Sequence, residues 1–462
     1  MKGIDVIFLV LLTTTTSWLI LLPRRIPGIL KLLTVVIILL ALAQFLIYGF
    51  YWHYLPGYLL ILSISLMAVF STNSIGKLKL KLLQFFLLLL LIAALLPWSI
   101  FLPVPELTKP QGDYKVGTRI FRWVDSSRAE QLTSDLTDKR NVVVQAWYPT
   151  EENAKGSSSA YLDGLGSLPE KVGILPRWIL DHYDQINTYG VLNAPISKAQ
   201  AQWPVILFLT GNGASRAFYT SLVAGLASHG YVVLAIDHPY EAMLTQLADG
   251  KIVTTIEDHR NDGPDLTKFM EGRLETRIAD IQFVLDQLDH PDGPNGNFFL
   301  ALDKNRIVIA GHSLGGASAA AAMAFDSRIK AAANIDGTLY GDLPKPNGAH
   351  PFLLIESKKD GSERYRRYEN GNQKFFKQFG GGYRYEIPEA DHYSFTDAPL
   401  LLALPARFFS GRFLQFGHIP KKTQNATVDI LTAFFSGALA NNLTDLDSVA
   451  NRYQGIIRKP VN

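Results

Sequence analysis

Four long apolar runs, separated by short breaks, make up the first hundred residues of the chain. They cover residues 4–22, 29–50, 55–70 and 82–102. About 20 apolar residues cross a bilayer, and the third and shortest run is extended by aromatic residues suited to the interface. One such run would also fit a buried core helix, but four in tandem with almost no charge favour membrane helices. The pattern therefore predicts an all-α transmembrane segment over residues 1–103.

Basic residues are unevenly distributed over the loops between these runs. Arg24 and Arg25 lie between the first and second runs, and Lys77, Lys79 and Lys81 lie between the third and fourth. The loop between the second and third runs has neither Lys nor Arg. Basic loops stay on the cytoplasmic side of a membrane. We therefore expect a multi-pass protein whose N-terminus and whose residues after the fourth run are extracytoplasmic.

A different pattern follows a proline-containing linker at residues 104–115. Short runs rich in Val, Ile and Ala alternate with segments of helical spacing, and residues 441–462 read as a tail. The expected strands are 142–148, 205–210, 231–236, 307–310, 331–335, 351–356 and 383–387. Strands alternating with helices predict a mostly parallel sheet with helices on both faces, so residues 116–440 are expected to form one α/β domain.

Three segments of this domain have other patterns. Residues 240–272 are polar and irregular, which suits an insertion over a site, and residues 421–440 suit a closing helix. Residues 398–420 are apolar with scattered arginines. They could lie on a bilayer, with their apolar face buried in the membrane interface and the arginines near the lipid headgroups, or they could form a pair of core helices. The sequence leaves both alternatives open.

Composition and charge narrow the function classes. The net charge is +3, and no block of basic residues indicates binding to nucleic acid. The chain has no cysteine, which excludes thiol nucleophiles, thiolate metal sites and disulfides. We expect neither a metal nor another cofactor.

A Gly-x-Ser-x-Gly motif stands where a strand should turn into a helix. Residues 307–310 read as a buried strand, Gly311 to Gly315 follow directly, and residues 317–324 are rich in alanine, which favours a helix. Strand, sharp turn and helix are the context of a nucleophile elbow, whose strained serine leaves no room for neighbouring side chains. We therefore expect Ser313 to be a nucleophile.

A serine nucleophile needs a base and an orienting acid. His392 follows the last expected strand and is the best candidate base, whereas His312 is expected to shape the turn. Asp336 and Asp360 each follow a strand and compete as the acid, since the carboxyl ends of parallel strands meet at one edge. Asp336 leaves an apolar strand and is favoured, while Asp360 also reads as part of a solvated turn.

An oxyanion hole requires two fixed hydrogen-bond donors. One is expected to be the backbone N–H of Leu314, next to the nucleophile, and the other the N–H of Asn212. Asn212 lies between two glycines after the strand 205–210, where the backbone can approach a substrate closely. A dinucleotide-binding fingerprint is excluded at these glycines because Arg216 occupies the third glycine position.

Four motifs link the chain to a known family. They are Val142-x-Val144-Gln145-x-Trp147-Tyr148-Pro149, Ala227-Ser228-His229-Gly230-Tyr231-Val232-Val233, Gly311-His312-Ser313-Leu314-Gly315-Gly316-Ala317 and His392-x-x-Phe395-x-Asp397. With them the chain resembles the plasma-type platelet-activating-factor acetylhydrolases and their bacterial relatives, in the α/β-hydrolase superfamily. The resemblance covers Val116 to Phe435.

The resemblance implies an α/β-hydrolase fold and hydrolysis of short-chain or oxidised acyl esters without a metal. It also places the acid at Asp336. One departure is that Thr210-Gly211 stands where the family usually has His-Gly in the oxyanion loop. A further departure is the membrane segment, which is foreign to the plasma enzyme.

The expected function is a membrane-anchored serine ester hydrolase acting on short-chain or lipid-derived esters. Its expected partners are an ester or phospholipid substrate and the lipid bilayer. The same residues would also allow an acyltransferase. A catalytically silent membrane protein that uses the fold for binding is the third alternative, which the intact Ser313, Asp336 and His392 disfavour.

Overall fold

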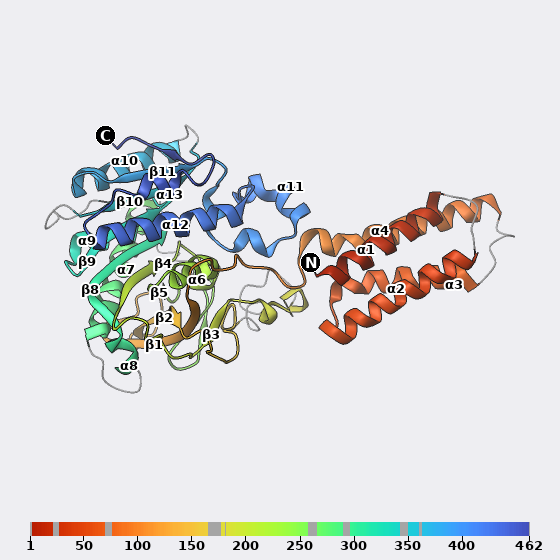
Figure 1. Cartoon of the computed structure of the whole chain (residues 1–462), viewed down its shortest axis with the longest axis horizontal. Coiled ribbons are helices and arrows are strands. Elements are labelled where there is room, and N and C mark those ends of the chain that lie inside the picture. Colours follow the sequence, from red (N-terminus) through yellow and green to blue (C-terminus); the bar gives the residue numbers. More distant parts are fainter. Residues whose placement is uncertain are drawn as a thin grey trace. The chain divides into compact units, whose positions relative to one another are not determined.

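The computed structural model describes residues 2–21, 27–69, 76–164, 177–180, 182–256, 266–289, 296–341, 350–359 and 363–461. Contacts between Cα atoms divide the chain into two compact units (Figure 1). The four-helix unit contains residues 1–105 together with 176–185 and 401–410. The sheet unit contains residues 106–175, 186–400 and 411–462.

The helices of the four-helix unit are antiparallel to their neighbours (Figure 1). Its helices are α1 (Gly3–Leu21), α2 (Pro27–Tyr48), α3 (Leu55–Val69) and α4 (Lys77–Ile100), with the short helix η1 (Trp52–Tyr54) before α3. Each of α1, α2 and α4, and the continuous helical stretch Trp52–Val69, is long and apolar enough to cross a membrane. The four apolar helices predicted from the sequence are therefore present.

Polar side chains are turned inward in this unit. The hydroxyl of Tyr54 donates to Asp5 at 2.7 Å, and the Gln44 amide donates to the carbonyl of Gly49 at 2.9 Å. Asp5, Gln44 and Tyr54 are all buried. Many leucines of the same helices are exposed instead, which suits a surface in contact with lipid rather than water.

A sheet of ten strands, in the order β12-β11-β10-β9-β8-β4-β5-β2-β1-β3, forms the centre of the sheet unit. The strands are β1 (Lys115–Ala129), β2 (Lys139–Thr150), β3 (Gly190–Leu192), β4 (Trp203–Leu209), β5 (Val232–Asp237), β8 (Leu302–His312), β9 (Ile329–Ile335), β10 (Phe352–Ser357), β11 (Tyr383–Ile387) and β12 (Ile457–Arg458). Neighbours from β5 through β4, β8, β9 and β10 to β11 are parallel. The mostly parallel sheet is therefore confirmed.

Helices cover both faces of this sheet. One core contains side chains of α7 (Leu266–Asp289), α8 (Gly296–Leu300), α9 (Leu314–Phe325) and α10 (Glu363–Phe379). The other contains side chains of α6 (Thr220–Ser228), α12 (Pro420–Leu439) and α13 (Leu446–Ala450). Strand β4 contributes Leu207 to the first core and Phe208 to the second, as expected when successive side chains point to opposite faces. The predicted two-faced α/β arrangement is confirmed.

Several short elements complete the chain. They are η3 (Arg177–Leu180), η4 (Tyr183–Gln185), η5 (Arg216–Tyr219), η7 (His392–Phe395) and η8 (Ala398–Leu401). Within residues 240–272, expected to be irregular, β6 (Thr245–Gln246) and β7 (Ile252–Val253) form a small hairpin. Residues 421–440, expected to be a closing helix, lie almost entirely in α12.

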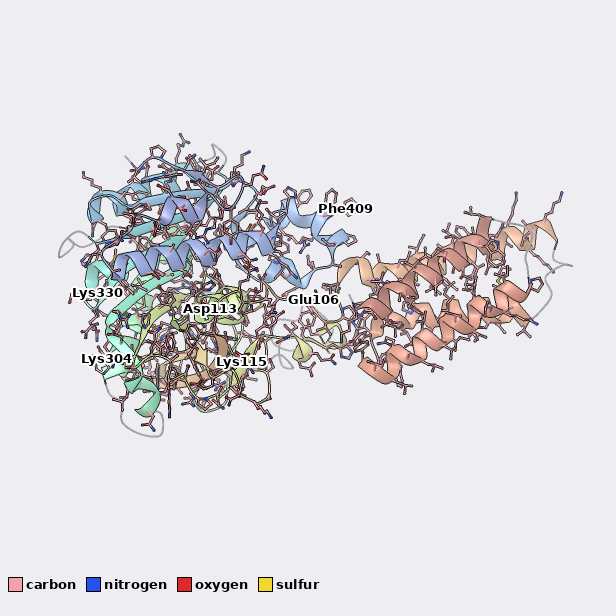
Figure 2. The ribbon with its side chains drawn as sticks, viewed as in Figure 1. Glu106, Asp113, Lys115, Lys304, Lys330 and Phe409 are labelled. Atoms are coloured by element: carbon pink, nitrogen blue, oxygen red, sulfur yellow. The ribbon has the colours of Figure 1, made fainter. Side chains whose placement is uncertain are left out.

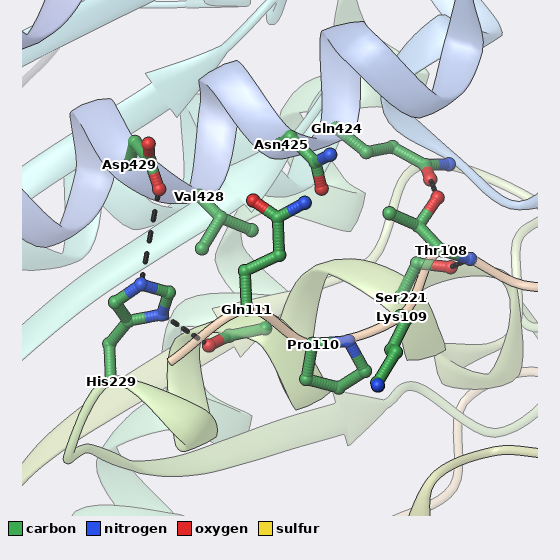
Figure 3. Close-up of a pocket in the computed structure, with 11 residues that line it drawn as sticks. Thr108, Lys109, Pro110, Gln111, Ser221, His229, Gln424, Asn425, Val428 and Asp429 are labelled. Atoms are coloured by element: carbon green, nitrogen blue, oxygen red, sulfur yellow. Dashed lines mark hydrogen bonds and ion pairs between the residues drawn. The ribbon is translucent and has the colours of Figure 1, made fainter. Parts of the chain in front are cut away.

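Residues 106–115 are bound along the helices of the sheet unit, although the sequence suggests a linker. The N–H of Thr108 donates to the hydroxyl of Ser221 at 3.1 Å, and that of Gly112 to the hydroxyl of Ser228 at 3.0 Å. The Thr108 hydroxyl also donates to Gln424 of α12 (Figure 3). Residues 441–462, expected to be a tail, likewise contribute α13 and the edge strand β12, which pairs with β11.

The segment 398–420 contains helix α11 (Leu404–Leu414). Residues 401–410 of this segment belong to the four-helix unit, where the N–H of Ala403 donates to the carbonyl of Ile100 at 3.0 Å. Phe408 and Phe409, the latter labelled in Figure 2, are 74% and 77% exposed. Such exposure does not fit the core helix pair that was one of the two expected alternatives.

Candidate active site

Ser313 occupies a strained turn between β8 and α9. Its φ of 57° and ψ of −127° lie in a region that non-glycine residues rarely adopt. A Cβ atom on Gly311 would lie 2.4 Å from the Gly315 carbonyl, and one on Gly315 would lie 2.4 Å from the carbonyl oxygens of Leu209 and Thr210. The predicted strand, turn and helix are confirmed, and both glycines are required by this close approach.

Three side chains from distant parts of the sequence meet at this turn. The Nε2 atom of His392 lies 3.0 Å from the Ser313 hydroxyl oxygen, and its Nδ1 atom lies 2.7 Å from Oδ2 of Asp336. Asp336 follows β9 and His392 begins η7, so both lie at the carboxyl edge of the sheet. The structure therefore brings Ser313, His392 and Asp336 into one hydrogen-bonded series.

The partners determine where the protons of this series lie. Burial alone would raise the pKa of Asp336, but the charge of Lys359 and the hydrogen bond from His392 outweigh it, so this pKa lies well below its usual value. An ionised carboxylate only accepts hydrogen bonds. The Nδ1–H of His392 therefore donates to Asp336, and Nε2 is the ring nitrogen that faces the Ser313 hydroxyl.

Asp336 has further partners on β10 and the turn after it. The backbone N–H of Ser357 donates to Oδ1 at 2.8 Å, and the Ser357 hydroxyl lies 3.0 Å from both carboxylate oxygens. Lys359 forms an ion pair with Oδ1. No sequence motif singles out Lys359, whose neighbours along the chain suggest only a solvated turn. The alternative acid, Asp360, lies outside the described residues.

His312 belongs to a second hydrogen-bonded series behind the nucleophile. The Gly211 N–H donates to the Tyr219 hydroxyl at 2.9 Å, and that hydroxyl lies 2.9 Å from Nδ1 of His312. The Nε2 atom of His312 lies 2.8 Å from the His392 carbonyl, to which it donates. Burial, and then the neighbouring His392, lower the pKa of His312 to about 3. A neutral His312 therefore fixes the loop of His392.

The loop after β4 is held by a buried arginine. Arg277 of α7 donates to the carbonyl of Thr210 at 2.6 Å and to the carboxylate of Glu241 at 2.9 Å. The Thr210 carbonyl lies at the point where Thr210-Gly211 replaces the family's His-Gly. The hydrogen bond from Arg277 fixes the peptide between Thr210 and Gly211. Neither Arg277 nor Tyr219 was identified from the sequence, because each acts through a backbone contact that no motif records.

Donors for an oxyanion remain at two backbone positions. Leu314 is the first residue of α9, and the N–H groups of a helix's first turn have no partner within the helix. The Gly211 N–H is already donated to Tyr219, so Asn212 is the next N–H along that loop. The N–H groups of Leu314 and Asn212 remain predictions for this role.

A cavity of about 860 Å³ opens onto Ser313, Leu314, Asp336 and His392. Three tyrosines, Tyr340, Tyr365 and Tyr368, and Met270 also line it. A much smaller pocket of about 10 Å³, between residues 108–111 and the helices α6 and α12, contains none of these residues (Figure 3). Among the described residues, no group of three or more His, Asp or Glu side chains is arranged to hold a metal ion.

Comparison with known proteins identifies the family. The profile of the family described as platelet-activating factor acetylhydrolase, isoform II, matches residues 101–451, which is most of the chain. The chain belongs to this family. The match extends beyond both ends of the region Val116–Phe435 in which the sequence motifs suggested the resemblance.

Individual relatives match over shorter stretches. A probable 1-alkyl-2-acetylglycerophosphocholine esterase of Arthroderma benhamiae is 32% identical over 139 residues, which cover 30% of this chain and 32% of that protein. The platelet-activating factor acetylhydrolase of Canis lupus familiaris is 22% identical over 283 residues, covering 52% of this chain and 59% of the dog protein. The chain thus spans less than two thirds of the length of these relatives.

A solved structure agrees with the family assignment. The ferulic acid esterase from Streptomyces cinnamoneus is similar with a TM-score of 0.64 and 27% identity, covering 77% of this chain and 99% of that one. This platelet-activating-factor acetylhydrolase family member therefore has the α/β-hydrolase fold, preceded by four apolar helices.

Proposed function

We propose that the chain is a membrane-anchored serine hydrolase that cleaves short-chain or lipid-derived carboxylic esters, with catalysis in residues 116–440. The observation that carries the proposal is the continuous series from Ser313 through His392 to Asp336, which opens onto the 860 Å³ cavity. Membership of the acetylhydrolase family, and a relative named as a probable 1-alkyl-2-acetylglycerophosphocholine esterase, support this substrate class.

The first half of the reaction forms an acyl-enzyme. The Ser313 oxygen bonds to the ester carbonyl carbon while its proton passes to Nε2 of His392, and Asp336 stabilises the resulting imidazolium. The N–H groups of Leu314 and Asn212 donate to the oxyanion. The carbon–oxygen bond to the alcohol then breaks, and the leaving oxygen takes the proton from Nε2.

The second half releases the acid. A water molecule gives a proton to Nε2 of His392, and its oxygen bonds to the acyl carbon. The bond from that carbon to Ser313 breaks, and the serine oxygen recovers its proton from Nε2. The products are a carboxylic acid and the alcohol, so hydrolysis consumes one water and leaves the protein unchanged.

Covalent labelling tests the nucleophile. The full-length protein in detergent is expected to form a fluorophosphonate adduct on Ser313, because the probe reacts with a serine activated by a base. Ser313→Ala should abolish labelling, whereas Ser327→Ala, at an exposed serine just after α9, should keep it. An unlabelled wild-type protein would instead favour a silent binding protein.

Substrate tests separate the remaining alternatives. We expect hydrolysis of p-nitrophenyl esters to fall with acyl length and a phospholipid with a short sn-2 chain to be cleaved. Product analysis with added alcohols distinguishes hydrolysis from acyl transfer, since a transferase would form a new ester in place of the free acid.

We also propose that α1–α4 are membrane spans, with the C-terminus outside the cytoplasm. Support comes from their length and apolar character and from the basic residues between the first and second and between the third and fourth apolar runs. A phosphatase reporter at the C-terminus, active only outside the cytoplasm, should be active. Activity of a cytoplasm-only reporter there would reverse the orientation.

A further inference from the structure

Lys359 bonds to the carboxylate that orients the histidine. Its ammonium forms an ion pair with Oδ1 of Asp336, while Oδ2 of the same carboxylate receives the Nδ1–H of His392. The ammonium also donates to the Ser357 hydroxyl at 2.9 Å and lies 4.4 Å from the ring centre of Tyr368. Its side chain is only 18% exposed. Three groups therefore hold this lysine where it is.

We propose that Lys359 is a positioning residue that sets the pH range in which His392 can act as the base. This inference rests on the proposed function, since it concerns the same site. An ionised carboxylate beside an imidazole favours the imidazolium. A cation on the other oxygen of that carboxylate partly cancels this effect. Through Asp336, the Lys359 ammonium therefore opposes the influence of the carboxylate on the imidazole.

Other charged and titratable groups also surround the site. From β10, Glu356 is paired with Arg384 of β11 at 2.8 Å. Behind the nucleophile, burial keeps His312 neutral, and burial raises the pKa of Tyr219 far above the working range. The remaining titratable side chains on the walls of the cavity are Tyr340, Lys358, Tyr365, Tyr368, Glu389, Asp391 and His418, and Tyr393 lies with its ring against His392.

Lys359 differs from the neighbouring Lys358 in its direct contact with the Asp336 carboxylate. Among the described residues, Lys359 is the one lysine or arginine in an ion pair with Asp336. Lys358 precedes it, lines the same cavity and is exposed to solvent. An exposed charge is screened by water and acts weakly, whereas one in contact with a buried carboxylate is screened much less. The two neighbouring lysines therefore provide a matched pair for an experiment.

The test is the pH dependence of kcat/KM for a p-nitrophenyl ester, measured on the full-length protein in detergent. Lys359→Met should move the acidic limb of the profile upward by about one pH unit, the size expected when one nearby charge is removed. Lys359→Arg should return the limb close to the wild-type position because it keeps the charge. Lys358→Met makes the same change in net charge and should leave the limb in place.

The outcomes separate this inference from the proposed function. An active Lys359→Met protein with the wild-type profile, or an equal shift in Lys358→Met, would refute the role of Lys359 and leave the esterase intact. Absence of fluorophosphonate labelling in the wild type would instead refute the esterase. If Lys359→Met folds poorly, the rate of fluorophosphonate labelling can be measured against pH instead, because only folded molecules react with the probe. The acidic limb of that profile should show the same upward shift.

Discussion

Both units of this chain are rich in apolar residues, but the four-helix unit exposes many of them on its surface, whereas the sheet unit buries them in its interior. In the four-helix unit, Leu21 and Leu46 are exposed, whereas Asp5 and Gln44 are buried among the helices. In the sheet unit, the apolar residues fill two cores on either side of the sheet.

The difference is the one expected if the four-helix unit lies in a membrane, as proposed, and the sheet unit lies in water. An apolar surface is costly in water and favourable in lipid, while a polar group is the reverse. The sheet unit keeps its polar chemistry at the carboxyl edge, where strands end and Ser313, Asp336 and His392 meet. An exposed leucine is therefore expected to face lipid in the four-helix unit and water in the sheet unit. Substitutions can test this difference.

The largest expected effect concerns the chemistry of the sheet unit. Ser313→Ala should lower kcat/KM by about 10³ to 10⁶, because the acyl-enzyme can no longer form. Ester hydrolysis by the purified full-length protein measures this. Retention of more than a tenth of the activity would mean that another group attacks the ester, and Ser327→Ala provides the control.

The next effect compares two leucines of nearly equal exposure. Leu39 of α2 is 58% exposed and Leu300 of α8 is 60% exposed. Leu39→Lys should cost about 3 kcal/mol in membrane insertion, since a charge at the middle of a span is unfavourable. Leu300→Lys should change stability by no more than about 0.5 kcal/mol.

The yield of membrane-inserted, detergent-extractable protein measures both variants. Equal tolerance of the two lysines would contradict the contrast between the units, because it would mean that Leu39 faces water.

A buried carboxylate of the sheet unit gives a pH-dependent effect. Burial raises the pKa of Asp397 to about 7, although the Ser221 N–H donates to it at 3.2 Å. The folded state therefore holds this proton between about pH 4 and 7 while the unfolded chain has lost it, so stability falls as the pH rises through that window. Asp397→Asn should remove this loss, a difference of about 2 kcal/mol between pH 5 and 7.

The measurement is the apparent Tm in detergent at pH 5, 6 and 7. The Tm of Asp397→Asn should rise relative to the Tm of the wild type as the pH increases. The exposed Asp249→Asn should track the wild type. A constant gap for Asp397→Asn would show that its carboxyl does not titrate in this range.

The smallest effect is expected from the series behind the nucleophile. Tyr219→Phe removes the acceptor of the Gly211 N–H and the partner of His312, and should cost about 1 kcal/mol, or roughly fivefold in kcat. Tyr231→Phe removes a hydroxyl bonded to Ser436, away from the site, and should leave kcat unchanged. Equal rates for the two variants would mean that the oxyanion loop is held without Tyr219.

Much of the fold could be predicted because local pattern dictates it. Apolar runs of membrane length mark α1, α2 and α4, and short β-branched runs mark the parallel strands from β5 to β11. The edge strand β12 was missed, since its two residues owe their pairing to β11 rather than to any pattern of their own.

Part of the site was also readable in the sequence. The glycines around Ser313 are needed by a turn that spans only a few residues, so a local motif records them. Asp336 and His392 were candidates because parallel strands end at one edge, which places the residues after each strand near that edge. Their proposed roles rest on the distances between them.

Tertiary structure alone decided which distant groups touch. Lys359 reaches Asp336, Arg277 reaches the Thr210 carbonyl, and residues 401–410 join the four-helix unit through contacts between segments far apart in sequence. A sequence pattern indicates whether a residue lies in an apolar or a polar environment, because the periodicity of its neighbours along the chain shows which face of a helix or strand is buried. The partner of a single buried charge depends instead on how the sheet and its helices pack, and so only the folded chain determines it.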